Sequence, residues 1–135
     1  MDRSDAYGNP GGRDVEVATV RAIYDAFAHR DVEAALAFIA TDIEFLPQGT
    51  AALAGRTVAY RGHDGVREYF RDAARVWDDL TLHAHDIRAA TGSVVVFGHV
   101  DGRVAGEPVE RRVIWTWQVR DGCAVSMRVS DLGEA

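Results

Sequence analysis

The sequence has a single cysteine, fewer basic than acidic residues and no long apolar run. Cys123 is the one cysteine among 135 residues, so an internal disulfide is excluded. Lys and Arg number 15 against 21 Asp and Glu, which gives a formal net charge of −6. Because nucleic-acid binding needs a basic surface that neutralises phosphates, this balance argues against a nucleic-acid partner.

No apolar stretch approaches the length of a bilayer span, and the N-terminus carries no apolar signal region. These absences predict a chain without a membrane partner and with a cytoplasmic location. Hydrophobic residues nevertheless make up 47% of the chain, and the mean hydropathy is −0.14. A chain of 135 residues with this composition is expected to build one domain around one core.

The spacing of apolar residues predicts helices first and strands afterwards. Residues 1–13 are polar and rich in glycine, so we expect a disordered tail before a single domain over 14–135. Asp31 is expected to cap the second helix, and Asp121-Gly122 is a strong signal for the last hairpin turn. The expected helices span 14–29, 32–39 and 66–77, and the expected strands span 43–46, 81–90, 93–101, 108–120 and 123–131, with a long connection over 48–62.

This order of elements indicates an α+β fold in which three N-terminal helices pack in a curved antiparallel sheet. The helices can cover only one face of the sheet. If the sheet curls around them, the enclosed space is a blind cone whose open end admits a ligand.

Two tryptophans mark one strand of this sheet. Alternation places four large apolar residues on one strand face: Val113, Trp115, Trp117 and Val119. Such a face either seals a core or walls a pocket for a flat, hydrophobic ligand. The opposite face carries Ile114 and Thr116 and has no helix to cover it, so we expect a homodimer through the outer sheet face.

Several local strings, together with the element order, resemble the nuclear transport factor 2-like superfamily, in particular its SnoaL-like polyketide cyclases and ketosteroid isomerases. The resemblance covers roughly residues 14–131. It implies a cystatin-like cone, and it leaves the activity open because the superfamily contains isomerases, cyclases, dehydratases, epoxide hydrolases and binding domains. The strings that carry it are Ile23–Phe27, Arg30–Asp31, Ala40–Phe45, Tyr60–Phe70 and Val125–Arg128.

The catalytic acids of these relatives are absent. Leu46 stands where ketosteroid isomerases carry their base, and Trp115 stands where they carry a proton-donating Asp. SnoaL-type cyclases carry a His and an Asp on the strand of Trp115, and neither has a match here. They also carry an acidic residue on the last strand, and none matches it around Ser126. Arg111 or Arg128 imitates the Arg of the epoxide hydrolases of this fold, but no pair of acids lies at the matching parity. The known chemistries therefore do not transfer residue by residue.

The remaining candidates for catalysis are His99, Tyr24 and Asp131. By resemblance, the strand faces that carry Phe97 and Met127 look into the cone, which would place His99 deep and Asp131 near the mouth. A histidine beside a carboxylate removes protons at neutral pH, and a phenol hydrogen-bonds a developing oxyanion.

Each candidate also has a purely structural interpretation. His99 is equally well a core histidine bonded to a backbone carbonyl, Tyr24 a core residue of its helix, and Asp131 a surface residue near the C-terminus. His83 and His85 share a strand face as a possible metal pair, but no third ligand is apparent in the sequence. We therefore expect neither a metal nor a cofactor.

Two functions follow from these observations. The first is a small-molecule enzyme of the isomerase, cyclase or dehydratase type that acts on a hydrophobic carbonyl compound in the conical pocket. The second is a non-catalytic module of the same fold that binds a small molecule or dimerises. In either case the residues expected to contact the ligand are Trp115, Trp117, Phe97, Met127, Leu46 and Tyr69.

Overall fold

The computed structural model describes residues 10–90 and 92–134, and it has the α+β architecture that the sequence predicts. None of the helices in this part of the chain combines the length and the apolar character that a membrane span requires. The helices are α1 (Pro10–Ala28), α2 (Val32–Leu36), α3 (Gln48–Leu53) and α4 (Gly62–Val76), and the strands are β1 (Ile39–Leu46), β2 (Tyr60–Arg61), β3 (Asp79–Ala90), β4 (Ser93–Val104), β5 (Glu107–Arg120) and β6 (Cys123–Glu134).

The described strands form one sheet in the order β2-β1-β6-β5-β4-β3. Strands β3 to β6 pair antiparallel as a meander, which confirms the predicted strand succession. The β5–β6 hairpin turns at Asp121 and Gly122, whose φ angles are 55° and 77°. A two-residue hairpin turn of type I′ requires positive φ at both positions, and this explains the residue pair found there. Strand β1 joins the other edge of β6 in parallel, so the sheet is mixed.

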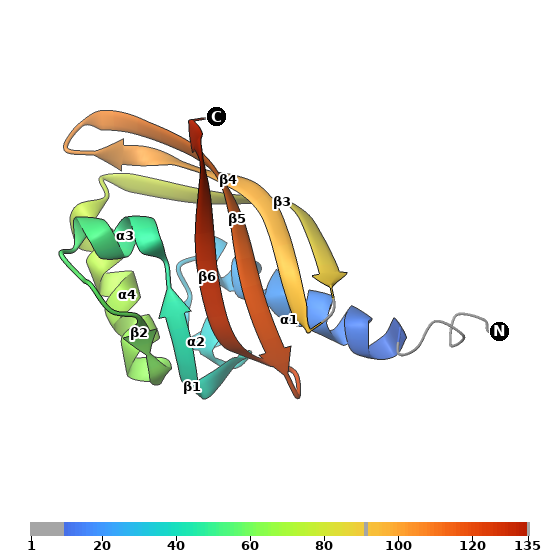
Figure 1. The fold of residues 1–135 in the computed structure, drawn as a ribbon. Coiled ribbons are helices and arrows are strands. Elements are labelled where there is room, and N and C mark those ends of the chain that lie inside the picture. The colour runs from blue at the N-terminus through green and yellow to red at the C-terminus, as the bar shows by residue number, and fades with distance from the viewer. Residues whose placement is uncertain (1–9, 91, 135) are drawn as a thin grey trace.

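The sheet curves because extra residues interrupt its ladders. Register shifts occur between Ala84 and Asp86 on β3 and at two places between β5 and β6. A bulge bends its strand and increases the local twist. Figure 1 shows the long strands arching over α1, with α3 and α4 toward one end of the arch. This curvature opens the space that becomes the cavity.

Several helix boundaries differ from the prediction, since α2 ends at Leu36 and α4 begins at Gly62. Helix α1 begins at Pro10, four residues before the expected start, and the rest of the expected tail, residues 1–9, lies outside the described residues. The expected long connection contains the six-residue helix α3. The predicted cap of α2 is confirmed, because the Asp31 side chain accepts a hydrogen bond from the Ala34 backbone N–H at 3.1 Å.

An aromatic core lies between the helices and the concave face of the sheet. Phe27 of α1 contacts Phe45 of β1 and Tyr69 of α4 with ring centroids 6.1 Å apart in both cases. Trp115 and Trp117 on β5 are 4% and 1% exposed. Helix α4 turns apolar residues toward this core, with Val66 and Tyr69 buried.

Candidate functional site

A cavity of about 740 Å³ lies inside the curved sheet. Its size is within the range of small-molecule sites, and its walls are mostly apolar, as such sites usually are. Helix α3 contributes Thr50 and Leu53 to its lining, so the segment expected to be a loop supplies part of the wall. The aromatic wall residues are Tyr24, Phe27, Phe45, Tyr69, Trp77, Trp115 and Trp117.

Tyr24 is held in the wall by the two tryptophans of β5. The Trp117 indole N–H donates a hydrogen bond to the Tyr24 hydroxyl oxygen at 3.1 Å. The Tyr24 ring also meets the Trp115 ring edge-on at a centroid distance of 5.3 Å. Because Trp117 uses the oxygen of Tyr24 as an acceptor, the Tyr24 O–H proton can be donated to a ligand.

Burial keeps the phenols of the cavity protonated. Desolvation raises the pKa of Tyr24 well above its ordinary value, although the hydrogen bond from Trp117 opposes this shift. Burial likewise raises the pKa of Tyr69 to about 12, against the smaller opposing effects of the Arg30 charge and a hydrogen bond with Thr50. Near neutral pH both phenols are therefore hydrogen-bond donors and not bases.

A second polar feature lies in the cavity wall on β5 and β6. The Arg111 guanidinium donates from Nη2 to Asp131 Oδ1 at 3.0 Å and from Nε to both carboxylate oxygens at 3.2 Å. Hydrogen bonds from Arg111 and from the Gly133 backbone N–H lower the pKa of Asp131. Both side chains remain partly exposed to solvent. Asp131 is thus an ionised acceptor at neutral pH.

Most of the expected ligand-contacting residues lie at the cavity. Trp115, Trp117, Met127 and Tyr69 are part of its wall, and so are two of the three catalytic candidates, Tyr24 and Asp131. Their contact with a ligand and their roles in catalysis remain proposals.

The expected position of His99 is wrong. On β4 the residues opposite Trp115 and Trp117 are Val96 and Val94, so these valines share the inner face with the tryptophans. Phe97 pairs with Ile114, and Phe97 and His99 therefore point to the outer face, where both line a separate shallow groove. The error has a physical cause: β4 contains a run of apolar residues, and its inner face is interrupted by two glycines, so alternation did not distinguish its faces.

The expectation for Leu46 is also wrong. Leu46 is not part of the cavity wall, whereas its neighbours Phe45 and Pro47 are. Phe45 is buried and Leu46 only partly so, in keeping with the alternation along β1.

Sequence reasoning did not assign Arg111 to the site. Arg111 has the same parity on β5 as Trp115 and Trp117, and this signal could have placed it in the wall. Its pairing with Asp131 could not be read from parity, because a register shift between Arg112 and Val113 displaces β6 against β5 at this point.

Comparison with known proteins agrees with this geometry. Residues 20–127 match the family model of the SnoaL-like domain. The chain belongs to the SnoaL-like domain family. Among curated proteins, none matches it.

Solved structures share the SnoaL-like fold over most of this chain. An NTF2-like protein of unknown function from Burkholderia pseudomallei is 24% identical, with a TM-score of 0.77. The match covers 87% of this chain and 90% of that protein. TerC, crystallised with polyporic acid, is 25% identical with a TM-score of 0.77, at 87% and 91% coverage. A candidate polyketide cyclase from Xanthomonas campestris is 19% identical with a TM-score of 0.72, at 87% and 90% coverage.

Proposed function

We propose that this SnoaL-like chain binds a flat, hydrophobic carbonyl compound in its cavity. The observation that carries the proposal is the Tyr24 hydroxyl, which accepts from Trp117 at 3.1 Å and keeps its own proton for a ligand. A carbonyl oxygen is the complementary acceptor, and the indole and phenyl walls suit a flat apolar body. The co-crystallisation of TerC with polyporic acid supports a small organic ligand for this fold.

The cavity has two chemically different poles. Tyr24 is a neutral donor between the tryptophans, whereas Asp131 is a charged acceptor held by Arg111. A ligand with a carbonyl group at one end and a hydroxyl group at the other satisfies both poles. Binding of such a ligand needs no proton transfer, because both groups are in the required protonation state at neutral pH.

The binding proposal is tested by quenching of tryptophan fluorescence with a panel of aromatic ketones and quinones. Tyr24→Phe removes the donor and keeps the ring, so the affinity for carbonyl ligands should fall by about fivefold to tenfold. Tyr60→Phe is the matched control, because its hydroxyl donates to Asp72 outside the cavity wall. Equal affinity of the Tyr24→Phe variant and the native chain, or a panel that does not quench at all, would contradict the proposal.

A catalytic function of the isomerase, cyclase or dehydratase type is the second candidate, and the location of Asp131 in the cavity wall favours it. In such a reaction Asp131 would take a proton from the carbon beside the carbonyl, while Tyr24 would hydrogen-bond the oxyanion. Arg111 lowers the pKa of Asp131 and so weakens it as a base. For this reason binding comes first in our proposal and turnover second.

Asp131→Asn separates these two functions. If Asp131 is the base, the variant should lose about 100-fold or more in turnover of a ligand found in the panel. Asp86→Asn is the control, because Asp86 pairs with Arg88 outside the cavity wall. Unchanged turnover in Asp131→Asn would exclude this base and leave the binding proposal intact.

We also propose a homodimer through the outer face of the sheet. Phe97 and Leu132 are 40% and 49% exposed, and both line the shallow groove on that face. Large apolar side chains gathered on one exposed surface favour association with another protein surface. A second copy of the chain is the partner we propose, because a two-fold axis would bring the same apolar groove into contact with itself.

A further inference from the structure

Three histidines gather on β3 and β4, outside the cavity wall. His83 lies directly opposite His99 in the antiparallel pair, and Asp101 follows His99 by two residues on the same strand face. The bulge between Ala84 and Asp86 adds His85 to the group. Among the described residues that line the cavity there is no histidine, so the cluster is separate from the proposed ligand site.

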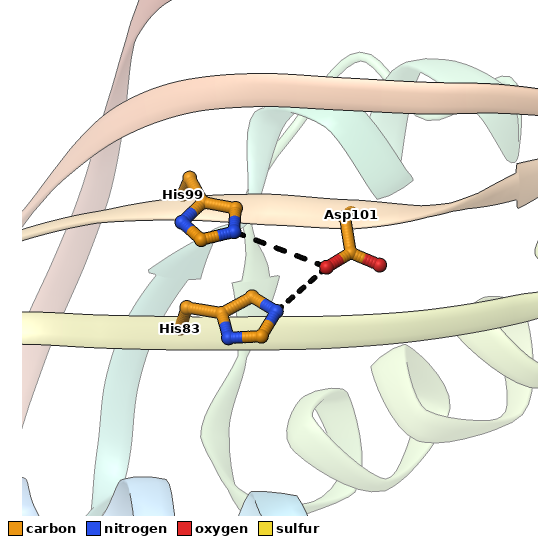
Figure 2. Close-up of side chains that lie close together, drawn as sticks. All are labelled: His83, His99 and Asp101. Carbon is orange, nitrogen blue, oxygen red and sulfur yellow. Dashed lines mark hydrogen bonds and ion pairs between the residues drawn. The ribbon is translucent and has the colours of Figure 1, made fainter. Parts of the chain in front are cut away.

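The three rings are stacked, and two of them, His83 and His99, approach the Asp101 carboxylate. The His83 and His99 rings are nearly parallel, at 10°, with centroids 4.1 Å apart, and His85 stacks on His99 at 4.8 Å. His83 Nε2 lies 2.6 Å from Asp101 Oδ2, and His99 Nε2 lies 3.9 Å from the same oxygen. Figure 2 shows this oxygen facing one ring nitrogen of His83 and one of His99.

We propose that His83, His99 and Asp101 form a binding site for a divalent transition-metal ion, with Zn²⁺ as the best fit. One ligand atom from each residue lies within 4.8 Å of the other two. Metal–ligand bonds of about 2.0–2.2 Å place the ligands of a tetrahedral Zn²⁺ about 3.3 Å apart. Small side-chain rotations therefore bring the three atoms into position. Two imidazoles and a carboxylate are donors that Zn²⁺ accepts, and a fourth position stays open to water.

His85 is the residue that positions His99. Its Nε2 lies 2.6 Å from His99 Nδ1, so one of these nitrogens carries the shared proton. When His99 Nδ1 is the donor, the lone pair of His99 Nε2 is free and directed toward the Asp101 side. A hydrogen bond to the distal nitrogen of a metal-bound histidine fixes its tautomer and its orientation. His85 thus supports binding without contacting the metal.

The charges around the cluster are mixed and do not prevent cation binding. On β5, Arg112 lies opposite His99 and Glu110 lies opposite Asp101. The carboxylates of Asp101 and Glu110 outnumber the guanidinium of Arg112. The two imidazoles of the proposed site bind metal in their neutral form. From the sequence, His83 and His85 are a possible metal pair without an apparent third ligand, so no metal is expected. The antiparallel register instead brings His99 and Asp101 of β4 beside His83, and these two residues replace His85 in the proposed ligand set.

The experiment is a calorimetric titration of the EDTA-treated, dialysed chain with Zn²⁺ alone. We expect about one Zn²⁺ per chain with a dissociation constant below micromolar. His83→Ala and His99→Ala should each weaken binding by 100-fold or more. His85→Ala should weaken it by about tenfold, as expected for a positioning residue. His29→Ala is the matched control, because it removes one exposed histidine whose Nδ1 contacts the Asp25 carbonyl far from the cluster along the chain.

A second readout guards against variants that bind less because they are misfolded. Co²⁺ should give the visible absorption of a low-symmetry tetrahedral site in the native chain and in His29→Ala, and Asp101→Asn should change this spectrum. Circular dichroism of each variant confirms that it is folded. Weak binding of several Zn²⁺ ions per chain, or equal losses in His29→Ala and His99→Ala, would overturn the proposal.

Discussion

At the scale of single residues, the chemistry of the cavity depends on which partner each polar atom already has. The Trp117 N–H occupies the Tyr24 oxygen, and Arg111 occupies the Asp131 carboxylate. Tyr24 is left as a donor, and Asp131 is left as a weakened base. The side-chain identities alone permit other roles, because a neutral phenol and a protonated carboxyl group can each donate or accept a hydrogen bond, whereas an ionised carboxylate only accepts.

The raised pKa of Tyr69 predicts how the stability of the chain depends on pH. Burial raises its pKa from 10.0 to about 12, so the folded chain binds this proton more tightly than the unfolded chain. The contribution is fully present below pH 10 and is lost as the pH rises toward 12, by roughly 1.4 kcal/mol per pH unit. Urea unfolding of the native chain and of Tyr69→Phe between about pH 8 and about pH 11, on both sides of the ordinary phenol pKa, measures this loss of stability. The native chain should lose more stability with rising pH than the variant; parallel losses would contradict the assignment.

At the scale of elements, β4 decides how the sheet meets the core. Its inner face carries Gly98 and Gly102 between valines, and each glycine allows a close approach. A Cβ on Gly98 would lie 1.9 Å from the His83 carbonyl oxygen and 2.8 Å from the Trp115 ring. Glycine at this position therefore lets β3 and the indole pack tightly against β4. The same close pairing holds His83 beside His99.

Gly98→Ala is therefore expected to destabilise the chain. The added methyl group must push the β3 backbone away, and we expect a loss of about 3 kcal/mol in the free energy of unfolding. Gly49→Ala on α3 is the matched control, because a Cβ there meets nothing within 4 Å. That variant should be neutral or slightly more stable. Chemical denaturation of both variants measures the difference, and similar stabilities would show that β3 can shift at little cost.

At the scale of the whole molecule, the two faces of the sheet have different surroundings. The inner face packs against the helices and encloses the cavity, whereas the outer face carries the histidine cluster and the groove with Phe97 and Leu132. The proposed functions are divided in the same way. Small-molecule binding belongs to the inner face, and association with a second chain and with a metal ion belongs to the outer face.

The dimer proposal is tested by substitution on the outer face. Phe97→Asp places a charge in the groove, where a dimer would have to bury it, so the variant should sediment as a monomer at micromolar concentration. The native chain should sediment as a dimer. Val58→Asp is the control, because Val58 is 61% exposed and does not line the groove. A native chain that sediments as a monomer would refute the dimer, and a dimer unaffected by Phe97→Asp would place the interface elsewhere.

The sequence by itself determined the α+β class, the succession of the strands β3 to β6 and the inward face of β5. These features rest on short-range patterns: apolar spacing along α4, alternation through Trp115 and Trp117, and a turn at Asp121-Gly122 that requires positive φ. Each of these features depends on residues that are close together in the sequence, and the tertiary packing is consistent with it.

Only the tertiary structure decided which face of β4 turns inward, and with it the positions of Phe97 and His99. A strand that is apolar on both faces accepts either orientation locally, and the choice is made by its neighbours, since Val96 must lie opposite Trp115. The ion pair of Arg111 with Asp131 depends on a shift in strand register. The convergence of His83 with His99 depends on the register of the β3–β4 pair, which alternation alone does not give because a bulge shifts it between Ala84 and Asp86.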